Sequence, residues 1–74
     1  EVSAIVARNA AAERASFPVA ENQHRNGILH MSIVPARVSE KLTEQAIENA
    51  SLLAEALSYV GILAVEFFVS DDDV

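Results

Sequence analysis

The N-terminal part of the chain alternates apolar segments with polar ones. Residues 2–8, VSAIVAR, have the small and apolar composition of a β-strand with such side chains on both faces. A second, short strand is predicted at 17–20. It contains Pro18, and because proline has no N–H to donate to a neighbouring strand, this segment is expected at an edge or a bulge.

A polar segment and a third strand complete the first half of the chain. Residues 21–27, ENQHRNG, are the most polar stretch and are interpreted as a loop. Within it the Asn26-Gly27 pair favours a tight reverse turn, because both residues tolerate positive φ. Residues 28–34, ILHMSIV, predict a third strand, which Pro35 ends because it cannot donate a hydrogen bond.

The next segment has the pattern of one amphipathic helix. Ser39 is the predicted N-cap, with Glu40 favourable in the first turn, and Gly61 is the predicted residue that stops the helix. Between them apolar residues recur at spacings of four and three, and the acidic side chains fall mostly on other faces. The expected buried stripe consists of Leu42, Ala46, Ala50, Leu53 and Leu57, widened by Ile47 and Ala54.

Residues 62–70, ILAVEFFVS, predict a last strand that is buried on both faces, with one carboxylate in its middle. An ionised carboxylate taken out of water costs several kcal/mol unless something pairs with it. Either Glu66 lies at a solvated edge or it has a partner. For a buried carboxylate, that partner would be a metal ion or another cation.

The order strand, strand, strand, helix, strand predicts an α+β fold. We expect a mostly antiparallel sheet of about four strands, with one long amphipathic helix between the third and last strands. The 74 residues allow one small domain at most, and 51% of them are hydrophobic, which leaves surplus apolar surface on so short a chain. Since the first residue is Glu1, we expect a piece of a longer protein whose other parts cover that surface.

Charge and composition exclude several classes of function. The net charge is −6 and the five basic residues are scattered, which argues against a nucleic-acid-binding protein. The uncharged segment 56–65 is too short to span a bilayer, so no membrane partner is expected. Cysteine is absent, and so is any targeting pattern. These features favour a cytoplasmic protein.

A search for a complete active site from the residues alone fails. No glycine-rich phosphate loop is present, and His24 and His30 are not part of a zinc-binding set. Isolated polar groups remain, each with an ordinary structural explanation: Glu1, Arg8, Glu21, Asn22, His24 and Glu66. Glu1 would be a frayed terminus, Arg8 a surface charge at a strand end, and His24 a member of a polar loop. For Glu66, the apolar strand around it indicates a functional role as strongly as a structural one.

Three ordered blocks carry a family resemblance: EVSAIVARN, FPVAENQHRNGILHMSIVPARVS and VGILAVEFFVS. They resemble the C-terminal half of the ATP-grasp domain in the N5-carboxyaminoimidazole ribonucleotide synthase family, the ATPase subunit of phosphoribosylaminoimidazole carboxylase. The resemblance implies an ATP-dependent ligase of purine biosynthesis that uses MgATP. Such a ligase activates bicarbonate as carboxyphosphate and transfers the carboxyl group to 5-aminoimidazole ribonucleotide.

The resemblance also implies roles for individual residues. Glu1 matches the acidic residue that binds the nucleotide ribose, and His24 matches the histidine that lines the nucleotide site. Glu66 matches the first of two magnesium-binding glutamates, which suits the preference of Mg²⁺ for one or two carboxylates beside phosphate oxygens. Arg8 stands in the VAR block and is assigned a catalytic place near the phosphate or the bicarbonate.

Residues 1–74 are therefore expected to be an incomplete ATP-grasp domain that is inactive alone. The N-terminal domain, the lysine-bearing subdomain and the final strand with the second magnesium glutamate are expected to be absent. The glycine turn that the family commonly has around 9–13 is also missing. The alternative is a non-catalytic α+β interaction or dimerisation module. A homodimer is compatible with both readings, since the family commonly forms dimers.

Overall fold

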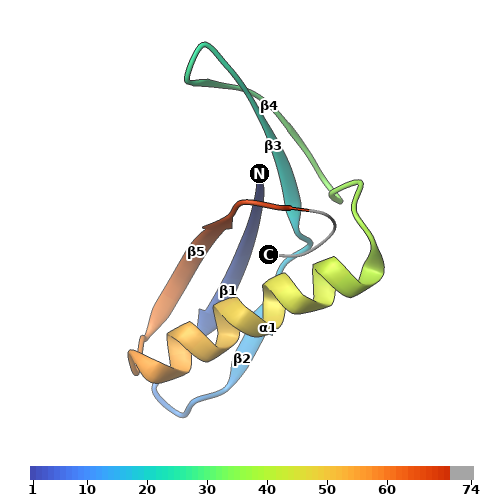
Figure 1. Cartoon of the computed structure of the whole chain (residues 1–74). Helices are drawn as coiled ribbons and strands as arrows, with labels where there is room; N and C mark the ends of the chain where they lie inside the picture. The colour runs from blue at the N-terminus through green and yellow to red at the C-terminus, as the bar shows by residue number, and fades with distance from the viewer. Residues whose placement is uncertain (71–74) are drawn as a thin grey trace.

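One antiparallel sheet with a single helix on one face makes up the computed structural model, which describes residues 1–70 (Figure 1). Strand β1 is central: it pairs with β5 along one edge and with β2 and β3 along the other, and β4 pairs with β3. The predicted α+β class is confirmed. The elements are β1 (Val2–Arg8), β2 (Arg14–Ser16), β3 (Ala20–Arg25), β4 (Ile28–Ile33), α1 (Glu40–Ala56) and β5 (Gly61–Phe67).

The strand predicted at 17–20 is wrong, because residues 17–19 separate two strands and Ala20 begins the second of them, β3. β2 pairs with the end of β1, where Val6 lies opposite Ser16, and β3 pairs with its beginning, where Ser3 lies opposite Ala20. The Phe17 amide still donates to the Ile5 carbonyl at 3.0 Å. Pro18 follows and has no N–H, so the regular pairing stops there.

The polar segment predicted as a loop is a strand for most of its length. β3 forms a hairpin with β4, and the register shifts between Gln23 and His24. The turn itself is confirmed: Asn26 and Gly27 have φ values of 55° and 76°, the left-handed conformations that a two-residue hairpin turn requires. The pattern misled because β3 is half-buried or exposed along its whole length, so polar side chains are tolerated on both of its faces.

Helix α1 begins as predicted and ends earlier than predicted. The Ser39 hydroxyl accepts a hydrogen bond from the Leu42 amide at 3.1 Å. At the other end Ser58, not Gly61, takes the left-handed conformation with a φ of 49°. The Ser58 amide donates to the Glu55 carbonyl and the Tyr59 amide to the Ala54 carbonyl, the bonding pattern of a Schellman motif.

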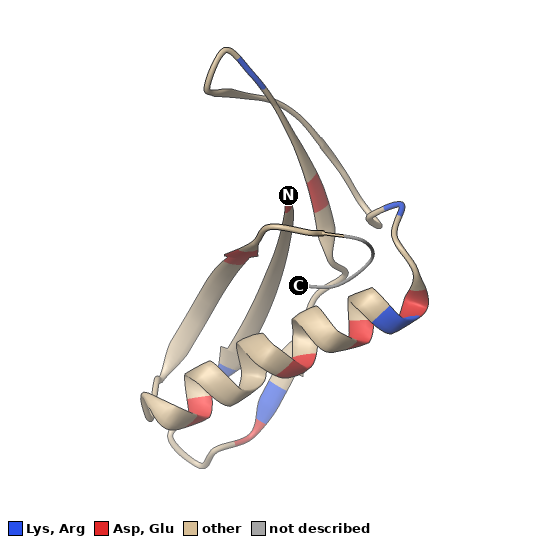
Figure 2. Ribbon diagram, in the orientation of Figure 1, with Lys and Arg blue, Asp and Glu red and all other residues tan. Residues whose placement is uncertain are grey.

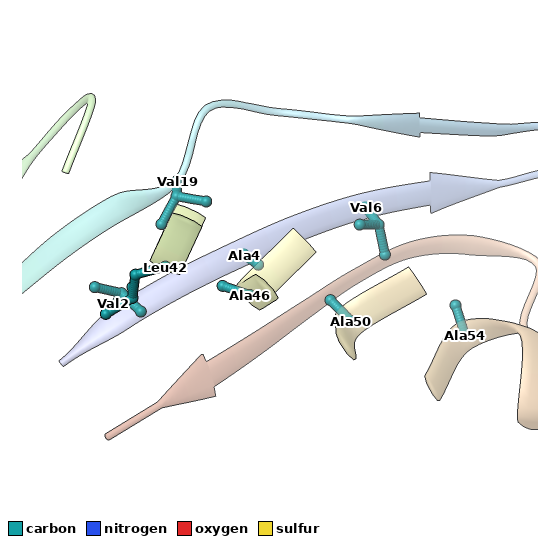
Figure 3. Close-up of a cluster of buried hydrophobic side chains, with 8 residues drawn as sticks. All are labelled: Val2, Ala4, Val6, Val19, Leu42, Ala46, Ala50 and Ala54. Carbon is teal, nitrogen blue, oxygen red and sulfur yellow. The ribbon is translucent and has the colours of Figure 1, made fainter. Parts of the chain in front are cut away.

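The core lies between α1 and β1 and is built largely from small side chains (Figure 3). The predicted stripe is wrong at Leu53 and Leu57, whose residues are 42% and 60% exposed. The buried positions instead follow one row of residues four apart, and their alanines let the helix approach the strand closely. The core consists of Val2, Ala4, Val6, Val19, Leu42, Ala46, Ala50 and Ala54.

The turn between β1 and β2 forms without the glycine expected for it. The Asn9 side-chain oxygen accepts hydrogen bonds from the Ala11 and Glu13 amides, each at 3.0 Å. Ala12 takes a φ of 64°, which costs a residue with a Cβ more than it would cost glycine. The Asn9 side chain thus organises a turn that the backbone alone does not favour.

An ion pair fastens the loop before α1 to strand β3. The Glu21 carboxylate accepts hydrogen bonds from the Arg37 side chain at 2.9 and 3.2 Å and from the Arg37 amide at 3.0 Å. The Arg37 side-chain bonds, followed by the backbone bond, lower the pKa of Glu21 from 4.5 to about 2. Because Glu21 lies on β3 and Arg37 precedes the helix, the pair couples the hairpin to α1.

This pKa shift predicts that stability falls in acid. The folded pKa of Glu21 is about 2 against an ordinary 4.5, so its contribution is complete above about 4.5 and is lost as the pH falls toward 2. Glu21→Gln should flatten the pH dependence of the free energy of unfolding, measured by urea titration from about pH 2.5 to about pH 6, which brackets the range of the loss. Glu48→Gln, an exposed change on α1, is the control. Equal pH profiles for wild type and Glu21→Gln would contradict the prediction.

A second prediction concerns the one large helix side chain in the core. Leu42 is fully buried, so Leu42→Ala should lower the free energy of unfolding by about 2–5 kcal/mol. Leu52, on the same helix, is 51% exposed. Leu52→Ala is therefore the matched control and should change stability by no more than about 0.5 kcal/mol. Urea titration followed by circular dichroism measures both, and equal losses would show that α1 packs through another face.

Candidate functional site

The candidate site lies on the face of the sheet opposite α1, which we call the open face. Side chains alternate along a strand, and Val2, Ala4 and Val6 of β1 are buried toward the helix. Ser3 and Ile5 therefore point to the open face. Because directly paired residues share a face, the pairings of β1 extend this assignment to the neighbouring strands.

Glu66 belongs to the open face. It lies opposite Ser3 in the pairing of β1 with β5 and is exposed. The expectation of a strand buried on both faces is therefore wrong within this chain, since only alternate residues of β5 are partly covered. The Glu66 carboxylate is therefore exposed and lies next to the Ser3 hydroxyl. A ligand can reach it, and folding of the chain does not bury an unpaired charge.

Glu1 is held in place by the sheet. Its carbonyl accepts a hydrogen bond from the Asn22 amide at 2.8 Å, which continues the pairing of β1 with β3. Its carboxylate lies 3.7 Å from Nε2 of His24, and the two side chains are 15% and 39% exposed. Glu1 is two residues from Ser3, so it is a diagonal neighbour of Glu66 on the open face. Glu1, His24 and Glu66 therefore come together.

Sequence reasoning missed two further residues at this site. Ser3 and Ser32 both form hydrogen bonds with the Asn22 side chain, Ser3 accepting at 2.5 Å and Ser32 donating at 2.8 Å. Serine in a strand carries no distinctive signal. Only the strand register places these hydroxyls beside the carboxylates.

Arg8 lies apart from these residues. It lies seven positions after Glu1, at the far end of β1, which corresponds to about 23 Å at about 3.3 Å per residue. Its guanidinium donates to the Tyr59 carbonyl at 2.9 Å, just after α1. At this end of the sheet lies an open cavity of about 420 Å³, lined by Ala7, Arg8, Asn9, Glu13, Arg14, Ala15, Gly61 and Ile62.

The donors at the site suit a hard cation only as part of a larger ligand set. Residues 1–70 contain no group of three or more His, Asp or Glu side chains placed to hold a metal ion. Acidic positions are spread along α1, with single ones on the strands (Figure 2). One exposed carboxylate fits Mg²⁺, which keeps several waters and combines one or two carboxylates with phosphate oxygens. Glu66 therefore fits as one ligand among several.

The described part of the chain has no helix with both the length and the apolar character needed to cross a membrane.

Comparison with known proteins identifies the family. The ATP-grasp domain family matches residues 1–74, the whole chain. The chain belongs to the ATP-grasp family. The fold of this ATP-grasp chain also matches solved structures. It superposes with a TM-score of 0.90 on the N5-carboxyaminoimidazole ribonucleotide synthetase of Thermus thermophilus, at 42% identity, covering 97% of this chain and 20% of that one.

A second solved structure and two curated relatives agree. The Staphylococcus aureus N5-carboxyaminoimidazole synthetase complexed with ADP gives a TM-score of 0.83 at 34% identity, over 99% of this chain and 19% of that one. The N5-carboxyaminoimidazole ribonucleotide synthase of Bacillus subtilis is 49% identical over 97% of this chain and 19% of its own length. That of Brucella melitensis is 49% identical over 97% and 20%. The chain thus spans about one fifth of the length of these relatives.

Proposed function

We propose that this ATP-grasp chain supplies the carboxylate-bearing half of a nucleotide site in an ATP-dependent ligase. The ligase activates bicarbonate as carboxyphosphate and carboxylates 5-aminoimidazole ribonucleotide in purine biosynthesis. The names of the relatives support this reaction. The observation that carries the proposal is the placement of Glu1, His24 and Glu66 at one end of the open face, although they lie far apart in the sequence.

In this proposal Glu1 and His24 bind the nucleotide. A carboxylate accepts hydrogen bonds from hydroxyl groups, so Glu1 can hold both ribose hydroxyls. His24 Nε2 lies 3.7 Å from that carboxylate and is held at the bulge in the hairpin. The imidazole would line the same nucleotide site and limit the positions that Glu1 can take.

Glu66 holds the metal end of the nucleotide. Bound Mg²⁺ would supply positive charge against the phosphates, where negative charge develops as the terminal phosphoryl group moves. The part of Glu66 is to offer one carboxylate oxygen from a strand hydrogen-bonded to β1 along its length. A ligand on a strand is positioned more tightly than one on a loop.

The catalytic place of Arg8 near the phosphate or the bicarbonate stays a prediction. Arginine has five N–H donors, and the Tyr59 carbonyl accepts from one terminal nitrogen. The cavity beside Arg8 is large enough for a small anion, but it lies at the other end of β1 from Glu1. Arg8 would therefore act on a different part of the reacting assembly than Glu1 and His24 do.

The 74-residue chain by itself is expected to be inactive, because in this proposal residues 1–70 supply one side of the nucleotide site and one carboxylate for the metal ion, Glu66. Purified chain mixed with MgATP, bicarbonate and 5-aminoimidazole ribonucleotide should release no phosphate above the rate without protein. The natural protein that carries this chain is the positive control. Phosphate release by the chain alone would contradict this expectation.

Glu66→Gln in that natural protein tests the proposal. The variant keeps the size of the side chain and removes the charge that binds the cation, so carboxylation should fall about 10²–10³-fold, as when one charge-stabilising group is removed from an active site. Glu48→Gln on α1 is the matched control. Phosphate release and carboxylated product, followed against Mg²⁺ concentration, measure the effect. Unchanged turnover would favour the non-catalytic interaction module.

Cytoplasmic location and a homodimer, both expected from the sequence, belong to the same proposal. Cell fractionation and light scattering of the natural protein would test them.

A further inference from the structure

Ser3 lies near the start of β1 on the open face, between two side chains of different chemistry. On one side Asn22 Nδ2 donates to the Ser3 hydroxyl oxygen at 2.5 Å. On the other side Glu66 of β5 is its direct pairing partner. Directly opposite residues have Cβ atoms about 4.5–5.5 Å apart, so a serine hydroxyl can reach a glutamate carboxylate by side-chain rotation alone.

Asn22 is itself held through both its side chain and its backbone. Ser32 on β4 donates to its oxygen at 2.8 Å, and the Asn22 backbone amide donates to the Glu1 carbonyl at 2.8 Å. A chain of hydrogen bonds thus runs from β4 through β3 to β1, and it ends at Ser3. Such networks fix the rotamers of their members more firmly than single bonds do.

This arrangement leaves the Ser3 hydrogen available. A hydroxyl donates one hydrogen bond and accepts up to two. With Asn22 as donor, the Ser3 oxygen accepts, and within residues 1–70 no protein group accepts the Ser3 hydrogen in return. The carboxylate of Glu66 is the charged acceptor directly opposite it.

We propose that Ser3 is a positioning residue for Glu66. Its hydroxyl, oriented by Asn22, donates to one Glu66 carboxylate oxygen and leaves the other oxygen to bind a divalent cation. The inference rests on the metal-binding role of Glu66 in the proposed function. A ligating carboxylate that is already hydrogen-bonded loses less side-chain freedom when the cation binds, and it keeps the orientation that the cation needs.

The alternative is that Ser3, Asn22 and Ser32 only hold three strands together. Both roles predict some loss of stability when Ser3 is replaced, so stability alone does not separate them. Metal dependence does, since a purely structural bond has no reason to change the affinity for a cation. Ser3→Thr keeps the hydroxyl and suits a strand, so it should retain the metal affinity that Ser3→Ala loses.

The experiment compares the natural protein with its Ser3→Ala variant. We expect the free Mg²⁺ concentration for half-maximal turnover, at saturating ATP, to rise about 10-fold or more, as for other partners of metal ligands. Binding of Mn²⁺, followed by electron spin resonance with a non-hydrolysable ATP analogue, should weaken in parallel. Ser3→Thr should remain within about two-fold of wild type by both measurements, well short of the loss expected for a missing partner.

Two further variants make the result decisive. Ser16→Ala makes the same chemical change on β2 opposite Val6, outside the site, and should leave both measurements unchanged. Glu66→Gln tests the proposed function itself. If Glu66→Gln weakens Mn²⁺ binding and Ser3→Ala does not, the positioning role is overturned and the proposed function stands.

If neither variant alters Mn²⁺ binding, the metal-binding role of Glu66 falls, and the inference falls with it. If Ser3→Ala weakens binding in the Glu66→Gln background as much as in wild type, Ser3 does not act through Glu66, which also overturns the inference. No added effect of Ser3→Ala in that background is the result expected.

Discussion

Strand β1 is hydrogen-bonded along both edges, and the rest of the molecule is placed by that pairing. Its alternate residues Val2, Ala4 and Val6 form the floor on which α1 packs. The residues between them face the other way. The alternation of side chains along β1 thus places one set of residues in the core and the other set on the open face. A shift of one residue in register would move each set to the wrong face.

The small size of the core side chains has a consequence for the site. Alanines at positions 46, 50 and 54 bring the helix close to β1, so the helix buries one side of this strand without large side chains. The open face lies on the other side of the sheet from the helix. Polar side chains lie at one end of it, where Glu1 and Glu66 are diagonal neighbours.

Exposed apolar residues are consistent with the surplus apolar surface expected from the composition. Ile28, Leu29 and Met31 on β4 are all exposed, and so is Phe68 just after β5. β4 pairs with β3 along one edge only in the described part of the chain. The relatives are about five times longer than this chain.

Much of the fold follows from local chemistry that a sequence displays. The Ser39 cap and the Asn26-Gly27 turn each depend on residues close together in the chain, and the structure confirms both. Errors arose where distant segments compete. The sequence predicts that the helix stops at Gly61, whereas Ser58 takes the left-handed conformation that ends it. The helix ends earlier because the row of helix residues that packs on β1 ends at Ala54, and no local sequence signal marks that position.

The candidate site divides in the same way. Residue types and the family resemblance singled out Glu1, His24, Glu66 and Arg8 from the sequence alone. Only the tertiary structure decided that the first three share one open face and that Arg8 lies at the far end of β1. Strand register brought Ser3 and Asn22 to the same place. Register depends on pairing between segments far apart in the chain, so side chains without a distinctive sequence signal become neighbours only when the sheet forms.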